Sequence, residues 1–372
     1  MCAEKGKTKR QPMKKERLLN VDFIRAICAI GIICFHFSVH SSSGIRLFIE
    51  FANGGVGKLL VTVFFILSGS MLYLNDREIP SLRRFYFKRW KALFPAFYIA
   101  WTFFFLENVH HTGSFFYLKG TASPASLLLT LTGLDGYFIY AIPNYYILGE
   151  WFLGAIVLLY LIYPLLLYGM NKYPLQTAVL VSAGFIWVAC WNRFQIDPNR
   201  NLLSCLFSFY LGALLCRHRR FLESRWTGII STAAAVFLLL VPLPFINQLI
   251  LIHIVGAAVY MSLYWIGKGV VSVRVGKLFS EKIGALSYPV FLLQHQVILR
   301  VLARRDPQSQ AGYTAVLLLT ICITVAAAWL LQFVTKKMTR SGAFQDLERH
   351  LFPDDKSLTV RESSDAYPQE EK

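Results

Sequence analysis

Residues 21–40 have the sequence VDFIRAICAIGIICFHFSVH, an almost unbroken apolar run with only a few polar side chains. A run of about 20 residues is the length that an α-helix needs to cross the hydrocarbon core of a bilayer. Only helices and closed barrels satisfy every backbone group in hydrocarbon, and the apolar residues here are continuous rather than alternating. The segment is therefore expected to be a membrane-spanning helix.

Nine further runs of this kind follow, and together they decide the fold class. The chain has 372 residues, of which 55% are hydrophobic and 16% are charged. A soluble globular chain has about a quarter of its residues charged. The pattern predicts an all-α integral membrane protein, a bundle of about ten transmembrane helices. Segment 124–142 is apolar but broken by glycine and aspartate, which indicates a re-entrant or interfacial segment. The nine runs are 56–75, 93–108, 144–169, 174–194, 201–216, 227–243, 246–266, 284–302 and 313–335.

The basic residues of the chain lie mainly in the connections between these runs. Lys and Arg number 38 against 21 Asp and Glu, and the formal charge of +17 could suggest a nucleic-acid partner. Their clustering beside the spans argues against nucleic acid, and most of them fall on the side that carries both termini. The positive-inside rule then predicts that the N- and C-termini are cytoplasmic and that the protein is a multi-pass protein of the plasma (inner) membrane.

Polar ends flank a single membrane domain. Residues 1–17 form a basic cytoplasmic N-terminal segment, and residues 18–340 form the transmembrane domain. Residues 341–372 form a polar cytoplasmic tail that is rich in charge, which predicts disorder. The sequence indicates neither an internal repeat nor a particular oligomeric state.

The first span carries polar groups that a lipid-facing helix would not. Asp22 and Arg25 are three residues apart and can pair on one helix face. Arg25 and His36 are eleven residues apart, three turns plus about 20°, so both side chains point the same way about 16 Å apart along the axis. Such groups line a bundle interior or a wet cavity and are functional candidates. Alternatively, Arg25 snorkels to the surface and His36 bonds to a neighbouring helix.

Five segments in the same order resemble one family of membrane enzymes. They are LLNVDFIRAICAIG at 18–31, whose Arg25 is followed after ten intervening residues by His36, FFILSG at 64–69, FKRWKALFPAFY at 87–98, WFLGAIVLLYLIYPLL at 151–166 and IGALSYPVFLLQHQVI at 283–298. The chain resembles the acyltransferase family 3 enzymes over about 280 residues. Two positions depart from the family pattern. Ala92 stands where a second arginine is common, and Ile156 stands where many members have a glutamate.

The resemblance implies a reaction and its participants. The donor would be an acyl-CoA, usually acetyl-CoA, and the acceptor a hydroxyl of an envelope polysaccharide or lipid-linked sugar. His36 would be the general base that deprotonates this hydroxyl, or would transiently carry the acyl group. Arg25 would position the donor. No tightly bound cofactor is expected, since acyl-CoA acts as a co-substrate, and membrane lipid surrounds the chain.

The basic segment 76–92 is the candidate site for coenzyme A. Its phosphates would be bound by Arg84 and Arg89 above all, with Lys88 and Lys91 beside them, because guanidinium matches phosphate geometry best. The alternative is that these residues only determine topology or contact anionic lipid headgroups.

Further residues are candidates for substrate binding, each with a structural alternative. Ser68 could serve helix packing, Trp151 could be an interfacial anchor, and Tyr288 and His295, two turns apart on one face, could bond between helices. No metal site is predicted, because His110 and His111 have no companion ligands at suitable spacing. The candidates are Asp22, Ser68, Glu150, Trp151, Tyr288 and His295.

A transporter or flippase for a lipid-linked glycan or small acid is the competing interpretation, because it would also have about ten spans and charges in its interior. Many transporters show inverted repeats, and none is evident here. Release of free coenzyme A thiol separates the two classes, since only the enzyme produces it.

Overall fold

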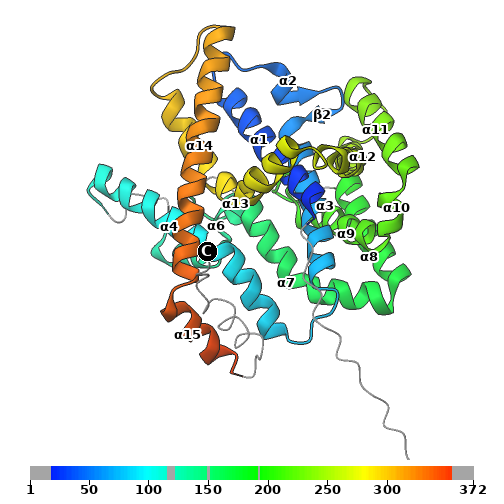
Figure 1. Ribbon diagram of the computed structural model, residues 1–372, viewed down its shortest axis with the longest axis horizontal. Helices are drawn as coiled ribbons and strands as arrows, with labels where there is room; N and C mark the ends of the chain where they lie inside the picture. Colours follow the sequence, from blue (N-terminus) through cyan, green and yellow to red (C-terminus); the bar gives the residue numbers. More distant parts are fainter. Residues whose placement is uncertain (1–17, 115–121, 149–150, 192, 354–372) are drawn as a thin grey trace, which may run out of the picture.

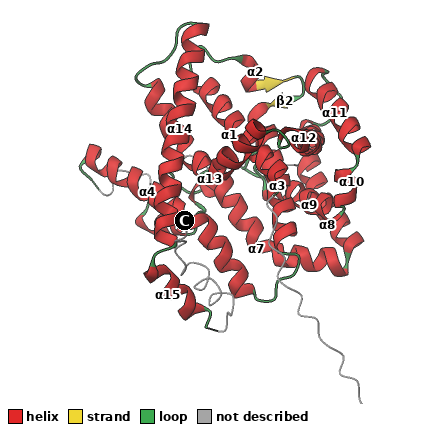
Figure 2. Cartoon of the chain, in the orientation of Figure 1, coloured by secondary structure: helices red, strands yellow, loops and turns green. Residues whose placement is uncertain are grey.

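The protein is described here by a computed structural model of residues 18–114, 122–148, 151–191 and 193–353 (Figure 1). Helices dominate it, as Figure 2 shows, which confirms the all-α class. The strands within the described part are the two-residue β1 (Glu50–Phe51) and β2 (Gly54–Gly55), an antiparallel pair. Residues 1–17, including the predicted basic segment, lie outside the described residues.

Each of the ten predicted runs falls on a helix. Eight helices of the described part are long and apolar enough to cross a membrane, while α9 and α11 are apolar but only 16 residues long. The count of about ten spans therefore stays a prediction, as does the side on which the termini lie. The helices are α1 (Leu19–His40), α3 (Val56–Asn75), α4 (Leu82–Thr112), α7 (Trp151–Lys172), α8 (Pro174–Trp191), α9 (Leu202–Arg217), α11 (Arg225–Leu240), α12 (Gln248–Val270), α13 (Arg274–Leu302) and α14 (Gln310–Thr339).

Short elements complete the described chain. The segment 124–142 does not form one long helix, in agreement with its predicted interruption, but three short turns. These three and three further short helices lie next to the spans. They are α2 (Arg46–Ile49), η1 (Pro124–Ser126), α5 (Leu127–Leu131), α6 (Asp135–Phe138), α10 (Arg219–Glu223) and α15 (Gly342–Leu351).

Two predicted boundaries are wrong. Residues 144–148 precede the helix that the sequence placed over 144–169, because α7 begins only at Trp151. The basic segment 76–92 was expected to be a loop, but from Leu82 onwards it belongs to α4. The Ser81 side chain caps this helix by accepting a hydrogen bond from the backbone N–H of Arg84 at 3.3 Å. The helix then runs unbroken from this basic turn into the span, so its charged residues lie on a rigid element.

The predicted disordered tail is also corrected where it is described. Residues 342–351 form α15, because its apolar side packs on the first turns of α4: Phe344 stacks on Trp90 with ring centroids 6.2 Å apart. A salt bridge of 2.5 Å joins Glu348 to Lys91 of α4. Residues 354–372 lie outside the described part.

Helices α1 and α13 lie side by side near the middle of the fold and run in the same direction (Figure 1). At one end Gly284 of α13 faces the backbone of Asp22 so closely that an added Cβ would be 2.4 Å from its carbonyl oxygen. At the other end the rings of His36 and His295 have centroids 4.0 Å apart. We call the end near Asp22 the basic end and the end near His36 the histidine end.

Helices α3 and α9 make the other close approach. A Cβ added at Gly69 would be 1.8 Å from the carbonyl oxygen of Phe209, and one added at Gly212 would be 1.8 Å from that of Ile66. The segment FFILSG therefore does serve helix packing, through its glycine. This contact fixes the position of the neighbouring Ser68 along the axis of the helix bundle.

Candidate functional site

A cavity of about 890 Å³ opens among α1, α3, α4, α7, α10 and α13 towards the basic end. Ligand sites of proteins typically measure about 300–1,000 Å³. Five residues singled out from the sequence line it together, although they come from four different helices. They are Asp22, Arg25, Ser68, Arg89 and Tyr288.

Two of the arginines at this cavity are held by buried carboxylates. Arg25 donates to Asp22 at 2.8 Å, and the carboxylate is 4% exposed while the arginine remains 33% exposed. The predicted pair on the first span is thus present. Arg89 donates to Asp76 at 3.1 Å, yet its Nε makes no hydrogen bond to any residue that the structure describes. The Arg89 side chain as a whole stays 22% exposed, so other parts of its guanidinium can reach a ligand in the cavity.

The structure adds two residues to this cavity that sequence reasoning missed. Arg219 lines it from α10, where its Nε also bonds to Glu223 at 2.5 Å. Tyr160 lines it from α7, with the Arg89 guanidinium 5.8 Å from its ring centre. The sequence showed Arg219 only as one of a basic group between two spans, and no spacing rule linked it to Arg25.

The other basic residues of α4 do not line the cavity. Lys88 lies 3.5 Å from the Asp76 carboxylate, to which Arg89 also donates a hydrogen bond. Lys91 pairs with Glu348 of α15. Arg84 lies in the first turn of the helix. Of the four residues predicted to bind coenzyme A, the structure therefore brings only Arg89 to the cavity.

Tyr288 and His295, predicted to share a face of one span, contribute to different ends. The Tyr288 hydroxyl donates to the backbone carbonyl of Leu93 at 2.9 Å beside the cavity. His295 lies two turns further along α13, where its ring meets that of His36. The two helices α1 and α13 thus both connect the cavity with the histidine end.

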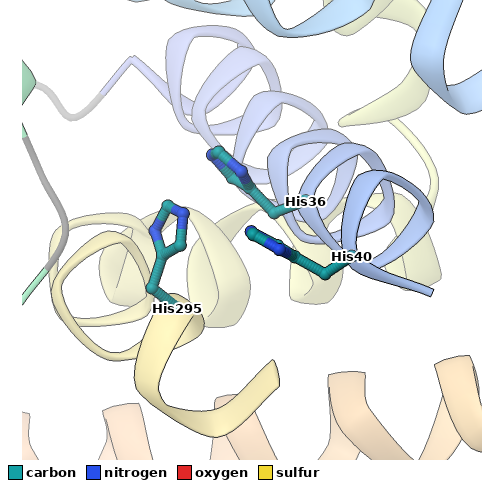
Figure 3. Close-up of side chains that lie close together, drawn as sticks. All are labelled: His36, His40 and His295. Atoms are coloured by element: carbon teal, nitrogen blue, oxygen red, sulfur yellow. The ribbon is translucent and has the colours of Figure 1, made fainter. Parts of the chain in front are cut away.

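Three imidazoles meet at the histidine end: His36 and His40 of α1 and His295 of α13 (Figure 3). We call this group the histidine cluster. Sequence reasoning missed His40, although its spacing of four from His36 places both on one helix face. The prediction of no metal site considered only His110 and His111 and overlooked these three side chains, whose nitrogens could hold a metal ion.

Trp151 is connected to this group through Arg200. The guanidinium of Arg200 is 5.3 Å from the Trp151 ring centre, and Arg200 is also close enough to His36 to act on it electrostatically. Trp151 thus contacts Arg200, and its predicted role as an interfacial anchor or a sugar contact stays a prediction. Glu150, the preceding residue, lies outside the described residues.

Three aromatic rings form part of the cavity wall on the side of the histidine end. Phe64, Phe152 and Phe291 line the cavity, and Phe152 contacts the other two, with ring centroids 5.9 Å from Phe64 and 5.1 Å from Phe291. Along their helices all three lie nearer the histidine end than Ser68, Tyr160 and Tyr288 do. A ligand that extended from the arginines towards His36 would run along these rings.

The fold and this site define a multi-pass helical membrane protein with an arginine-lined cavity. The chain belongs to the acyltransferase family: the sequence model described as an acyltransferase domain, acyltransferase family 3, matches residues 18–333. The protein is therefore an acyltransferase, as its sequence segments predicted, and this membership favours the enzyme over the transporter. No curated protein matches the chain, and neither does any solved structure.

Proposed function

We propose that this acyltransferase takes its acyl group, expected to be acetyl, from acyl-CoA and transfers it to a hydroxyl of an envelope polysaccharide or lipid-linked sugar. The arginine-lined cavity is the observation that supports the donor. Arg25, Arg89 and Arg219 reach it from three helices, and Asp22 is the one acidic residue among its described lining residues. A carboxylate pairs with each of these arginines, but their guanidinium groups still converge on one cavity, and their planar N–H groups suit the phosphates of coenzyme A.

The donor would bind with its phosphates at the basic end and its thioester towards the histidine end. Arg89 would meet a phosphate oxygen with the exposed part of its guanidinium while Asp76 holds the other part in place. The apolar wall of Phe64, Phe152 and Phe291 suits the pantetheine arm, which is far less polar than the nucleotide. Trp151 would contact the acceptor sugar, next to the histidine cluster.

His36 is the proposed general base. It would take the proton of the acceptor hydroxyl, whose oxygen attacks the thioester carbonyl carbon. The tetrahedral intermediate then expels the coenzyme A thiolate by breaking the C–S bond, and the imidazolium returns its proton to that sulfur. The products are the sugar ester and coenzyme A thiol. In a second route the imidazole itself carries the acyl group before the hydroxyl receives it. General base catalysis typically contributes a factor of about 10²–10⁴.

The proposed orientation puts the basic end at the cytoplasm in the plasma (inner) membrane. Acyl-CoA would then enter from the side on which it is made, and the acceptor would approach the histidine end from the opposite side. The concentration of Lys and Arg beside the basic end supports this direction.

The test is release of free thiol from acetyl-CoA by the purified protein in nanodiscs with host envelope extract. We expect His36→Ala to lower the release at least about 100-fold. His111→Ala is the matched control, because His111 is exposed near the end of α4, outside the cavity and the histidine cluster. Thiol release by a folded His36→Ala variant at the wild-type rate would contradict the mechanism, and labelled acetyl would identify the acceptor.

A further inference from the structure

The histidine cluster has the composition and the spacing of a metal site. The ligating nitrogens of His36, His40 and His295 all lie within 4.8 Å of one another. The ring centroids are 4.0 Å apart for His36 and His295, 5.9 Å for His40 and His295, and 6.4 Å for His36 and His40. Figure 3 shows the three rings converging from the two helices.

Two packed helices hold these ligands. The spacing of four residues puts His36 and His40 one turn apart on the same face of α1, and His295 faces them from α13. Beyond the cluster, the Ser41 hydroxyl donates to Asp306 at 3.0 Å, which ties the end of α1 to the connection after α13. A site built on helices keeps its ligands in place better than one built on loops.

We propose that His36, His40 and His295 bind a zinc ion. Zn–N bonds of about 2.0–2.1 Å place the nitrogens of a tetrahedral site roughly 3.3 Å apart, so modest side-chain rotations from the present spacing suffice. Every ligand in the cluster is an imidazole, which suits zinc and disfavours the oxygen-seeking Mg²⁺ and Ca²⁺. Three histidines leave a fourth position, and His40 is exposed, so water can complete the coordination.

Arg200 provides a feature that distinguishes this site from a surface cluster of histidines. Its positive charge acts on His36 and therefore opposes a cation bound there. Replacing it by a neutral residue should tighten zinc binding severalfold, whereas replacing a ligand should weaken it. Opposite changes of affinity from neighbouring residues are not expected of nonspecific binding.

The consequence for catalysis rests on the proposed function. Zinc coordinated by His36 occupies the nitrogen lone pair that a general base needs, so the metal and the substrate proton exclude each other. Zinc is therefore an inhibitor of this acyltransferase, and a chelator restores its activity. Binding itself does not depend on which donor or acceptor the enzyme uses.

The experiment is a zinc titration of the full chain in nanodiscs, purified through a tag without histidine and first freed of metal by a chelator. Equilibrium dialysis with elemental analysis should give one zinc per chain. We expect His40→Ala and His295→Ala to raise the Kd at least tenfold, Arg200→Gln to lower it severalfold and His111→Ala to leave it unchanged. Because His40 is exposed at the end of α1, its variant is expected to fold even where a variant of His295 does not.

Three outcomes overturn the proposal: no zinc bound by the wild type, binding that His40→Ala leaves intact, or binding lost in His111→Ala. Cobalt in place of zinc gives a second readout, since a four-coordinate cobalt site has strong visible absorption that should vanish in His40→Ala. The two hypotheses fail separately. Stoichiometric zinc binding together with full activity of His36→Ala would leave the metal site standing and refute the base.

Discussion

The contact between α3 and α9 gives a prediction whose size follows from the structure. Gly69→Ala would place a methyl carbon 1.8 Å from the Phe209 carbonyl oxygen, and Gly212→Ala would do the same at Ile66. Real Cβ contacts are essentially never shorter than 3.0 Å, so the helices would have to separate by more than 1 Å. Both partner atoms belong to backbone, which cannot rotate away as a side chain can.

Overpacking a close-packed interior costs about 1–3 kcal/mol, and a backbone obstacle puts each change at the upper end of that range. Phe209 and Ile66 are themselves fully buried, so separating the helices also opens the core around them. We expect each variant to unfold at a temperature lower by roughly 5 °C or more. The double variant should lose less than the sum of both, because one separation relieves both clashes.

The assay is thermal unfolding of the protein in one detergent, followed by tryptophan fluorescence. Gly269→Ala in α12 is the matched control, since an added Cβ there meets nothing within 4 Å. Alanine in a helix is favoured over glycine by about 0.5–1 kcal/mol, so the control should unfold at the wild-type temperature or above it. If Gly69→Ala and Gly212→Ala unfolded at the same temperature as the Gly269→Ala control, this account of the helix contact would be refuted.

Two further predictions concern the cavity and the histidine end. Arg89→Lys keeps the charge beside Asp76 but loses the planar guanidinium, so the KM for acetyl-CoA should rise about tenfold while kcat changes little. The control Arg225→Lys, at an exposed position, should change neither constant. Equal kinetics of the wild type and Arg89→Lys would show that Arg89 does not bind the donor. Hydrogen bonds from Ser42, and to a smaller extent from Ser41, lower the pKa of the Asp306 carboxyl group. The ionised carboxylate therefore stabilises the fold above the unfolded-state pKa of about 3.9, and this stabilisation is lost as the pH falls through the lower pKa of the folded state. Asp306→Asn should therefore unfold earlier than wild type at neutral pH and converge with it in acid, and a gap that is constant with pH would contradict this.

The spans were predictable because hydrocarbon imposes a length and a composition on every helix that crosses it. The shared face of Arg25 and His36 followed from helical periodicity, and the salt bridge of Asp22 with Arg25 from their spacing. Such rules act within one element. They failed at the start of α4, where a serine cap extended the helix back into a segment whose charge indicated a loop.

The remaining parts of the site depend on contacts between elements far apart in sequence. Arg219 reaches the cavity only because α10 lies beside it, and Lys91 is directed to α15 by Glu348, 257 residues away. Nothing local distinguishes these basic residues from others that determine topology. His40 is different, because its spacing from His36 was visible in the sequence. What was missing was the third ligand, which the packing of α13 on α1 supplies.

The arrangement of α1 explains why one helix can serve both ends of the proposed reaction. Arg25 borders the arginine-lined cavity and His36 belongs to the histidine cluster, three turns away on the same face. A rigid helix fixes the distance between donor anchor and base, so the reactive carbonyl must be carried to His36 by the ligand itself. Phe64, Phe152 and Phe291 form an apolar layer of the cavity wall on that side, and an uncharged arm passes such a layer at lower cost than a charged group does. The same layer that admits a thioester would thus keep the polyanionic end of the donor with the arginines and away from the acceptor.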